Sequence, residues 1–111
     1  EIHPEVAETL RDMGRVFYLQ EELDQALEQY QVSQEVYREA YGTDVHKHVA
    51  SVMYNMAMVY ECQSKYEEAL KFYEQALEIR KIVYGKLEHP EVAETLQNMA
   101  MVYNSQGNYD K

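Results

Sequence analysis

The chain is short of several residue types, and each shortage excludes a class of protein. It holds one cysteine, Cys62, so no disulfide can form within the chain, and a reducing compartment, the cytoplasm, is expected. Lys and Arg number 10 against 20 Asp and Glu, and the net charge of −10 repels nucleic acid and anionic membrane surfaces. No apolar run is long enough to span a membrane, and no signal-peptide pattern opens the chain. The first residue is Glu1 rather than Met, so we expect an excised fragment of a longer protein.

Motifs that carry catalysis are also missing from the sequence. It has no Gly-rich phosphate loop, no nucleophile elbow and no regular spacing of metal ligands. Cys62 has no histidine in register beside it, so we expect an inert thiol. The sequence therefore predicts neither an enzyme nor a bound cofactor.

What the sequence has instead is an internal repeat. The stretch "HPEVAETL" at residues 3–10 returns unchanged at 89–96, and "HKHVASVM" at 46–53 lies halfway between, 43 residues from each copy. A fixed period of this length is typical of a solenoid of stacked supersecondary units. The single domain, residues 1–111, then divides into repeat one at 1–42, repeat two at 43–85 and a partial repeat three at 86–111.

Each repeat has the pattern of two helices. Val6, Leu10 and Met13 are spaced by four and three residues, which places them on one apolar helix face. Gly42 and Gly85 are placed to end the second helix of a repeat with a left-handed cap. The sequence predicts an all-α chain of five helices and no strand, with helices near 4–20, 23–41, 47–63, 66–84 and 90–106.

Small residues recur where these helices would face each other. Gly14, Ala57 and Ala100 occupy one position of the first helix, and Ala26 and Ala69 occupy one position of the second. Small side chains let two helix axes approach closely, while large Tyr and Phe side chains fill the space beside them. We therefore expect most of the aromatic and Met side chains to form the core.

Histidines and acidic residues raise the question of a metal site. His3, His46 and His89 recur because the loop recurs, and we expect them to orient helix starts. An acidic cluster lies in residues 1–42, which carry ten Asp or Glu against three Lys or Arg; its members are Glu21, Glu22, Asp24 and Glu28. We expect a solvated outer face. A weak divalent-cation site, which oxygen ligands would suit, stays open as a minor alternative.

Two long stretches of sequence and one residue pattern carry a family resemblance. The stretches are "HPEVAETLQNMAMVY" and "KYEEALKFYEQALEIRKIVYG", and the pattern is Leu10, Met13, Gly14 and Phe17 followed by Ala26 and Tyr30. Over its whole length the chain resembles tetratricopeptide repeats of the long-helix variety found in kinesin light chains. The resemblance implies a right-handed superhelical solenoid of helix-turn-helix units, here two and a half repeats. It also implies a non-catalytic scaffold or adaptor that binds a peptide in a concave groove lined by the first helix of each repeat.

The resemblance further implies which side chains face that groove. Across the three repeats they are Glu8, Arg11, Arg15, Tyr18, Ser51, Tyr54, Asn55, Met58, Glu61, Glu94, Gln97, Asn98, Met101 and Asn104. The predicted peptide-binding surface consists of Arg11, Arg15, Tyr54, Asn55, Met58, Gln97, Asn98 and Met101. Asn55 and Asn98 are expected to bond the backbone of the peptide. A full clamp for a terminal carboxylate is absent, because only Arg11 and Arg15 supply cations.

The end of the sequence supports a second function class. A second helix of repeat three would begin near Tyr109, and the sequence stops at Lys111. Part of the apolar face of the preceding helix would then meet water; its members are Leu96, Met99, Ala100 and Tyr103. Because burial of a large apolar side chain contributes about 1.5–3 kcal/mol, this face favours association. A self-associating assembly unit, paired as a two-fold homodimer through repeat three, is therefore the alternative to a peptide-binding adaptor.

Overall fold

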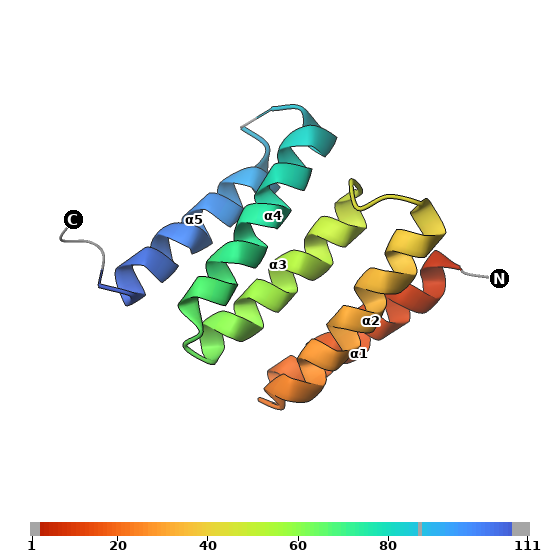
Figure 1. Ribbon diagram of the computed structural model, residues 1–111, viewed down its shortest axis with the longest axis horizontal. Coiled ribbons are helices and arrows are strands. Elements are labelled where there is room, and N and C mark those ends of the chain that lie inside the picture. The colour runs from red at the N-terminus through yellow and green to blue at the C-terminus, as the bar shows by residue number, and fades with distance from the viewer. Residues whose placement is uncertain (1–2, 87, 108–111) are drawn as a thin grey trace.

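The computed structural model describes residues 3–86 and 88–107, and over these residues the chain forms five α-helices and no strand (Figure 1). They are α1 (Pro4–Leu19), α2 (Leu23–Tyr41), α3 (Lys47–Cys62), α4 (Tyr66–Tyr84) and α5 (Pro90–Ser105). Every helix end lies within one residue of its predicted position, and the all-α prediction is confirmed. The start predicted for a further helix, Tyr109, lies outside the described residues. No helix in the described part of the chain is long and apolar enough to cross a membrane.

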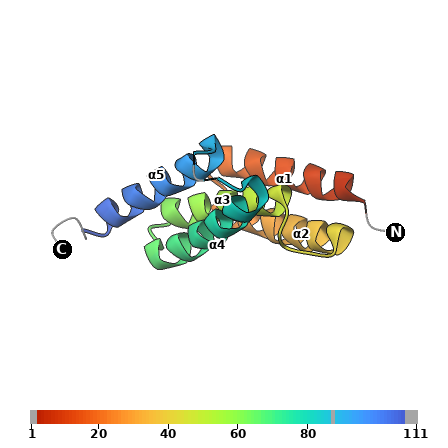
Figure 2. The same cartoon turned by 90° about the horizontal axis from the view of Figure 1, so that it is seen from above.

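The helices pack in adjacent pairs. α1 packs against α2, α3 packs against α4, and α2 and α4 in turn contact the helix that follows each of them. Figure 2 shows the result as two layers, with α1, α3 and α5 along one side of the molecule and α2 and α4 along the other. The molecule measures 51 × 35 × 18 Å, so it is about two helix diameters thick. Every helix therefore keeps a surface of its own.

Local sequence explains where the helices begin and end. Pro4 and Pro90 occupy the first turns of α1 and α5, where the missing N–H costs nothing. The side chains of His46 and His89 cap α3 and α5, because each Nδ1 accepts the backbone N–H two residues later at 3.1 Å. His3 precedes α1 without such a cap bond. The predicted role of histidine at helix starts is thus seen at two of the three positions.

The loops between repeats are built alike. Gly42 and Gly85 end α2 and α4 with φ angles of 72° and 69°, in the left-handed region that glycine adopts without strain. Tyr41, the last residue of α2, stacks on His46 with ring centroids 3.7 Å apart, and Tyr84 stacks on His89 at 3.5 Å. The stacking fixes the path of the chain from one repeat to the next.

The small residues lie between the helices of each pair. Ala26, Ala57 and Ala69 are fully buried, and Gly14 is buried as well. A Cβ atom on Gly14 would lie only 2.6 Å from Cε1 of Tyr30, so the ring occupies the space that a side chain would need. Ala100 is exposed, because none of the described helices covers that side of α5.

Candidate functional site

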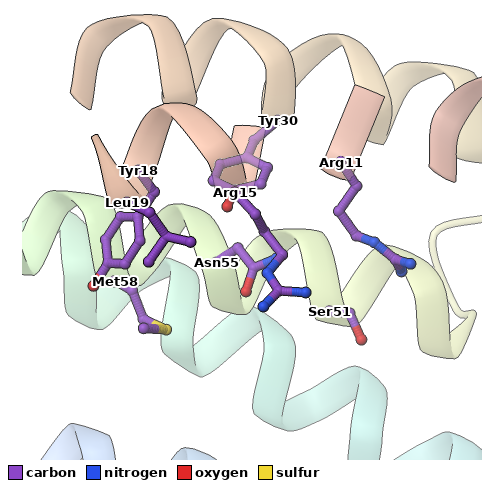
Figure 3. A pocket seen from close by; sticks show the side chains of 8 residues that line it. All are labelled: Arg11, Arg15, Tyr18, Leu19, Tyr30, Ser51, Asn55 and Met58. Atoms are coloured by element: carbon purple, nitrogen blue, oxygen red, sulfur yellow. The ribbon is translucent and has the colours of Figure 1, made fainter. Parts of the chain in front are cut away.

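Two adjoining hollows run along the side of the molecule formed by α1, α3 and α5. The first has a volume of about 390 Å³ and is lined by Arg11, Arg15, Tyr18, Leu19, Tyr30, Ser51, Asn55 and Met58 (Figure 3). The second has a volume of about 400 Å³ and is lined by Tyr18, Met58, Glu61, Cys62, Tyr66, Asn98, Met101 and Ser105. Because Tyr18 and Met58 line both, the hollows form one continuous surface, which we call the groove.

Six of the eight residues predicted to bind a peptide line the groove: Arg11, Arg15, Asn55, Met58, Asn98 and Met101. Tyr54 and Gln97 do not. Tyr54 is buried: its hydroxyl accepts a hydrogen bond from Nδ2 of Asn98 at 2.7 Å, and its ring lies 4.8 Å from the guanidinium carbon of Arg80. Gln97 is exposed on α5 outside both hollows.

Five lining residues lie outside the set that the resemblance implied: Leu19, Tyr30, Cys62, Tyr66 and Ser105. Tyr30 and Tyr66 belong to α2 and α4, whereas the groove was assigned to the first helix of each repeat alone. In the sequence, Gly14 could have indicated that Tyr30 reaches the groove, because the missing side chain on α1 lets the tyrosine ring approach from α2. Leu19, Cys62 and Ser105 stand at or next to the C-terminal ends of α1, α3 and α5.

The first hollow carries the positive charge of the groove. Figure 3 shows Arg11 and Arg15 reaching from α1 toward α3, with Ser51 and Asn55 beneath them. Arg11 forms an ion pair of 3.7 Å with Glu8, while Arg15 is exposed. Burial raises the pKa of Tyr30 to about 12, an effect that Arg15 and Arg11 partly oppose. The Tyr30 hydroxyl therefore stays neutral beside the two cations.

The two hollows meet at a mixed polar and apolar contact. The thiol of Cys62 donates to the hydroxyl of Tyr18 at 3.6 Å, which joins the ends of α1 and α3. Burial, followed by this hydrogen bond, raises the pKa of Tyr18 to about 12, so its hydroxyl is neutral. Met58 lies beside Tyr18 and offers an unbranched side chain that adapts to different apolar surfaces.

The second hollow has a different polar character. Glu61 accepts the hydroxyl proton of Tyr73 at 2.8 Å, and Asn98 donates through Nδ2 to the hydroxyls of Tyr54 and Tyr73 at 2.7 and 3.3 Å. The amide nitrogen of Asn98 is thus engaged inside the protein. The side chain of Asn55, in contrast, has no hydrogen-bond partner among the described residues, so both ends of its amide are available to a ligand.

The acidic cluster gains no support as a cation site. Across residues 3–86 and 88–107, no three His, Cys, Asp or Glu side chains lie close enough together to hold a metal ion. Glu21, Glu22, Asp24 and Glu28 are exposed and belong to the solvated surface.

The face predicted to self-associate lies on the uncovered side of α5. Leu96 and Tyr103 are 46% and 42% exposed, and Ala100 lies exposed between them. Met99 is partly buried and packs against the core. These four residues therefore form an apolar strip of which three members meet solvent.

Comparison with known proteins identifies the family. Tetratricopeptide repeats match residues 6–46 and 48–111, so the chain belongs to the tetratricopeptide repeat family, as the sequence predicted. Such repeats generally mediate protein–protein interactions and are typically non-catalytic.

Among solved structures, the fold is similar to the crystal structure of BtubC (BKLC) from P. vanneervenii. The TM-score is 0.85, with 23% sequence identity over 94% of this chain. The similar region makes up 41% of the BtubC chain, so the present chain spans less than half of that protein. No curated protein matches the sequence.

Proposed function

We propose that this chain is a non-catalytic adaptor that binds a peptide segment of a partner protein in the groove. The observation that carries the proposal is the position of Asn55, which lies on the floor of the first hollow with a free side-chain amide. An amide offers a donor and an acceptor together, which match the N–H and C=O of one peptide unit. A peptide bound there would exchange hydrogen bonds with water for hydrogen bonds with Asn55.

The rest of the groove supports a peptide as the ligand. Arg11 and Arg15 supply positive charge at one end, and Met58 and Met101 supply adaptable apolar contact along it. The lining combines apolar surface with a few convergent polar groups, as binding sites do. Two adjoining hollows of similar volume suit an elongated ligand better than a compact one.

The proposal is tested by selecting peptides from an array and measuring their affinity for variants. Asn55→Ala should weaken a selected peptide about tenfold, the cost of one to two hydrogen bonds. The melting temperature should not fall, because Asn55 makes no hydrogen bond within the described part of the protein and alanine favours the helix more than asparagine does. Gln31→Ala, an exposed amide on α2 in the opposite layer, is the matched control and should bind normally. Equal affinity of the Asn55 and Gln31 variants for every selected peptide would place binding elsewhere.

The alternative function, self-association through repeat three, is supported by the exposed strip on α5. Uncovered Leu96 and Tyr103 side chains favour pairing of two copies, and a two-fold arrangement buries the same strip on both. Sedimentation of the unaltered chain should then show a dimer, and Tyr103→Glu should convert it to a monomer. A monomer at high concentration of the unaltered chain excludes this function.

A further inference from the structure

The side of α1 that faces away from α3 carries an exposed apolar row. Val6, Met13 and Val16 are 51%, 43% and 52% exposed. Spacings of seven and three residues place them on one helix face. With Glu5 and Thr9, which are also exposed, they form what we call the outer face of α1.

The same residues occur on α5, where they are covered. Val92, Met99 and Val102 lie 86 positions after Val6, Met13 and Val16 in the sequence. Val92 and Val102 are fully buried, and Met99 is partly buried. The helix with which α5 makes its main contact is α4. The chain therefore contains two copies of one helix-binding face, and the structure of the copy on α5 shows what kind of helix fits it.

Arg80 of α4 is the polar anchor of that packing. It is only 3% exposed, and its Nη1 donates to Oγ1 of Thr95 at 2.8 Å and to the backbone oxygen of Glu91 at 3.2 Å. Its guanidinium also forms ion pairs with the carboxylates of Glu91 and Glu94, at 3.6 and 3.9 Å. The contact is specific because one guanidinium reaches two carboxylates, a hydroxyl and a backbone oxygen at once, which a smaller neutral side chain cannot do, although the Nε of Arg80 has no hydrogen-bond partner among the described residues.

The residues of α5 that contact Arg80 have identical counterparts on α1. Glu5, Glu8 and Thr9 stand where Glu91, Glu94 and Thr95 stand on α5. Their local geometry is the same as well: the Thr9 hydroxyl donates to the backbone oxygen of Glu5 at 3.1 Å, as the Thr95 hydroxyl does to that of Glu91 at 2.8 Å. Thr9 and Glu5 are therefore arranged as Thr95 and Glu91 are beside Arg80, while Glu8 pairs with Arg11 at 3.7 Å until an arginine of the partner competes for it.

The other junction between repeats shows that this arrangement is not general. On α2, the position of Arg80 is occupied by Tyr37, whose ring stacks on His48 of α3 at 5.3 Å. His48 and Val52 replace the Glu and Thr of the arginine junction. The chain thus holds one tyrosine junction and one arginine junction, and α1 carries the residues of the arginine junction.

We infer that the outer face of α1 docks an amphipathic helix of the α4 type, with an arginine that enters the Glu5, Glu8 and Thr9 site. A tyrosine four residues after the arginine completes the recognition, because the Tyr84 hydroxyl donates to the Glu91 carboxylate at 2.8 Å and Glu5 stands at the matching position. This face is separate from the groove, so the inference does not depend on the proposed function.

The test uses a labelled synthetic peptide with the sequence of α4, residues 66–84, titrated into the full chain. We expect saturable binding by fluorescence anisotropy. The same peptide with Arg80→Tyr, which copies the residue of α2, should bind about tenfold more weakly, because the carboxylates and the hydroxyl lose their charged donor. Absence of saturable binding, or equal affinity of the two peptides, would overturn the inference.

Variants of the chain locate the binding. Val16→Glu should abolish it, and the fold tolerates this change because Val16 is half exposed. Tyr103→Glu, a matched change on the uncovered side of α5, should leave the affinity for the peptide unchanged. Loss of binding in the Tyr103 variant alone would place the peptide on α5 and refute the assignment. The chain could also fail to bind the peptide and associate with itself instead. If Val16→Glu abolished that self-association, the face would be assigned to a second copy of the chain, and the inference would be overturned.

Discussion

At the scale of single residues, Gly14 is the position at which the packing between helices is tightest. In Gly14→Ala, the new Cβ would lie 2.6 Å from a ring carbon of Tyr30, a buried side chain that would have to shift. Overpacking costs about 1–3 kcal/mol, and alanine recovers about 1 kcal/mol of helix propensity. Urea unfolding should therefore show a lower free energy of unfolding. In a Tyr30→Leu background the same change should stabilise the protein, and a stabilising effect in the unaltered chain would contradict this account of the contact.

The histidines before and in α3 make stability depend on pH. The pKa of His46 is lowered by burial and by Lys47, and that of His48 is lowered by burial and then by His46 and Arg11, against a smaller opposing effect of Glu8. The unfolded chain therefore binds protons more readily. Stability conferred by the neutral imidazoles is present above the unfolded pKa of about 6.5 and is lost as the pH falls below it.

This pH dependence is measured as the melting temperature between about pH 7.5 and 5.5, a range in which exposed carboxylates titrate little. The double variant His46→Asn, His48→Gln should show a flatter curve, because Asn at the cap position still accepts a backbone N–H but does not titrate. An identical slope in the variant and the unaltered chain would assign the pH dependence to other groups.

At the scale of the helices, α5 is held by α4 through Arg80. In Arg80→Ala, the buried stem of the arginine and its bonds to Thr95 and Glu91 are lost, at a cost of about 2 kcal/mol or more. Hydrogen exchange should then accelerate in α5 more than in α1 to α3, because α4 is the helix that packs on α5. Lys81→Ala, which removes a surface ion pair with Glu78, should leave exchange nearly unchanged. Uniform acceleration along the chain would contradict this view.

Helix positions could be predicted closely from the sequence, and groove residues less so. Pro4, Pro90, Gly42 and Gly85 mark helix ends by local chemistry, which needs no knowledge of the neighbours. Tyr54 shows why the groove is harder. It shares a repeat position with Arg11 and Gln97, yet it is buried, because Arg80 from α4 and Asn98 from α5 both hold its side chain. That outcome depends on three helices at once, and a periodic pattern along one helix does not contain it.

At the scale of the whole molecule, the two-layer arrangement separates three surfaces that could receive a partner. The groove lies along α1, α3 and α5, the outer face of α1 lies at one end, and a third hollow of about 680 Å³ lies along α2 and α4 beside Met53, Phe72 and Ile79. The solenoid keeps these surfaces apart because the main contacts are between helices that follow each other in the chain.

Among the six methionines of the chain, at least one lies on each of these surfaces and can report ligand binding there. Met58 and Met101 line the groove, Met13 lies on the outer face of α1, and Met53 borders the third hollow. The central claim, that a partner peptide binds in the groove, is tested most directly by following the methyl NMR signals of ¹³C-labelled methionines while an array-selected peptide is added. The account predicts that the Met58 signal shifts most, together with Met101, while Met13 and Met53 stay in place. A shift confined to Met13 or Met53, with Met58 unchanged at saturation, would contradict it.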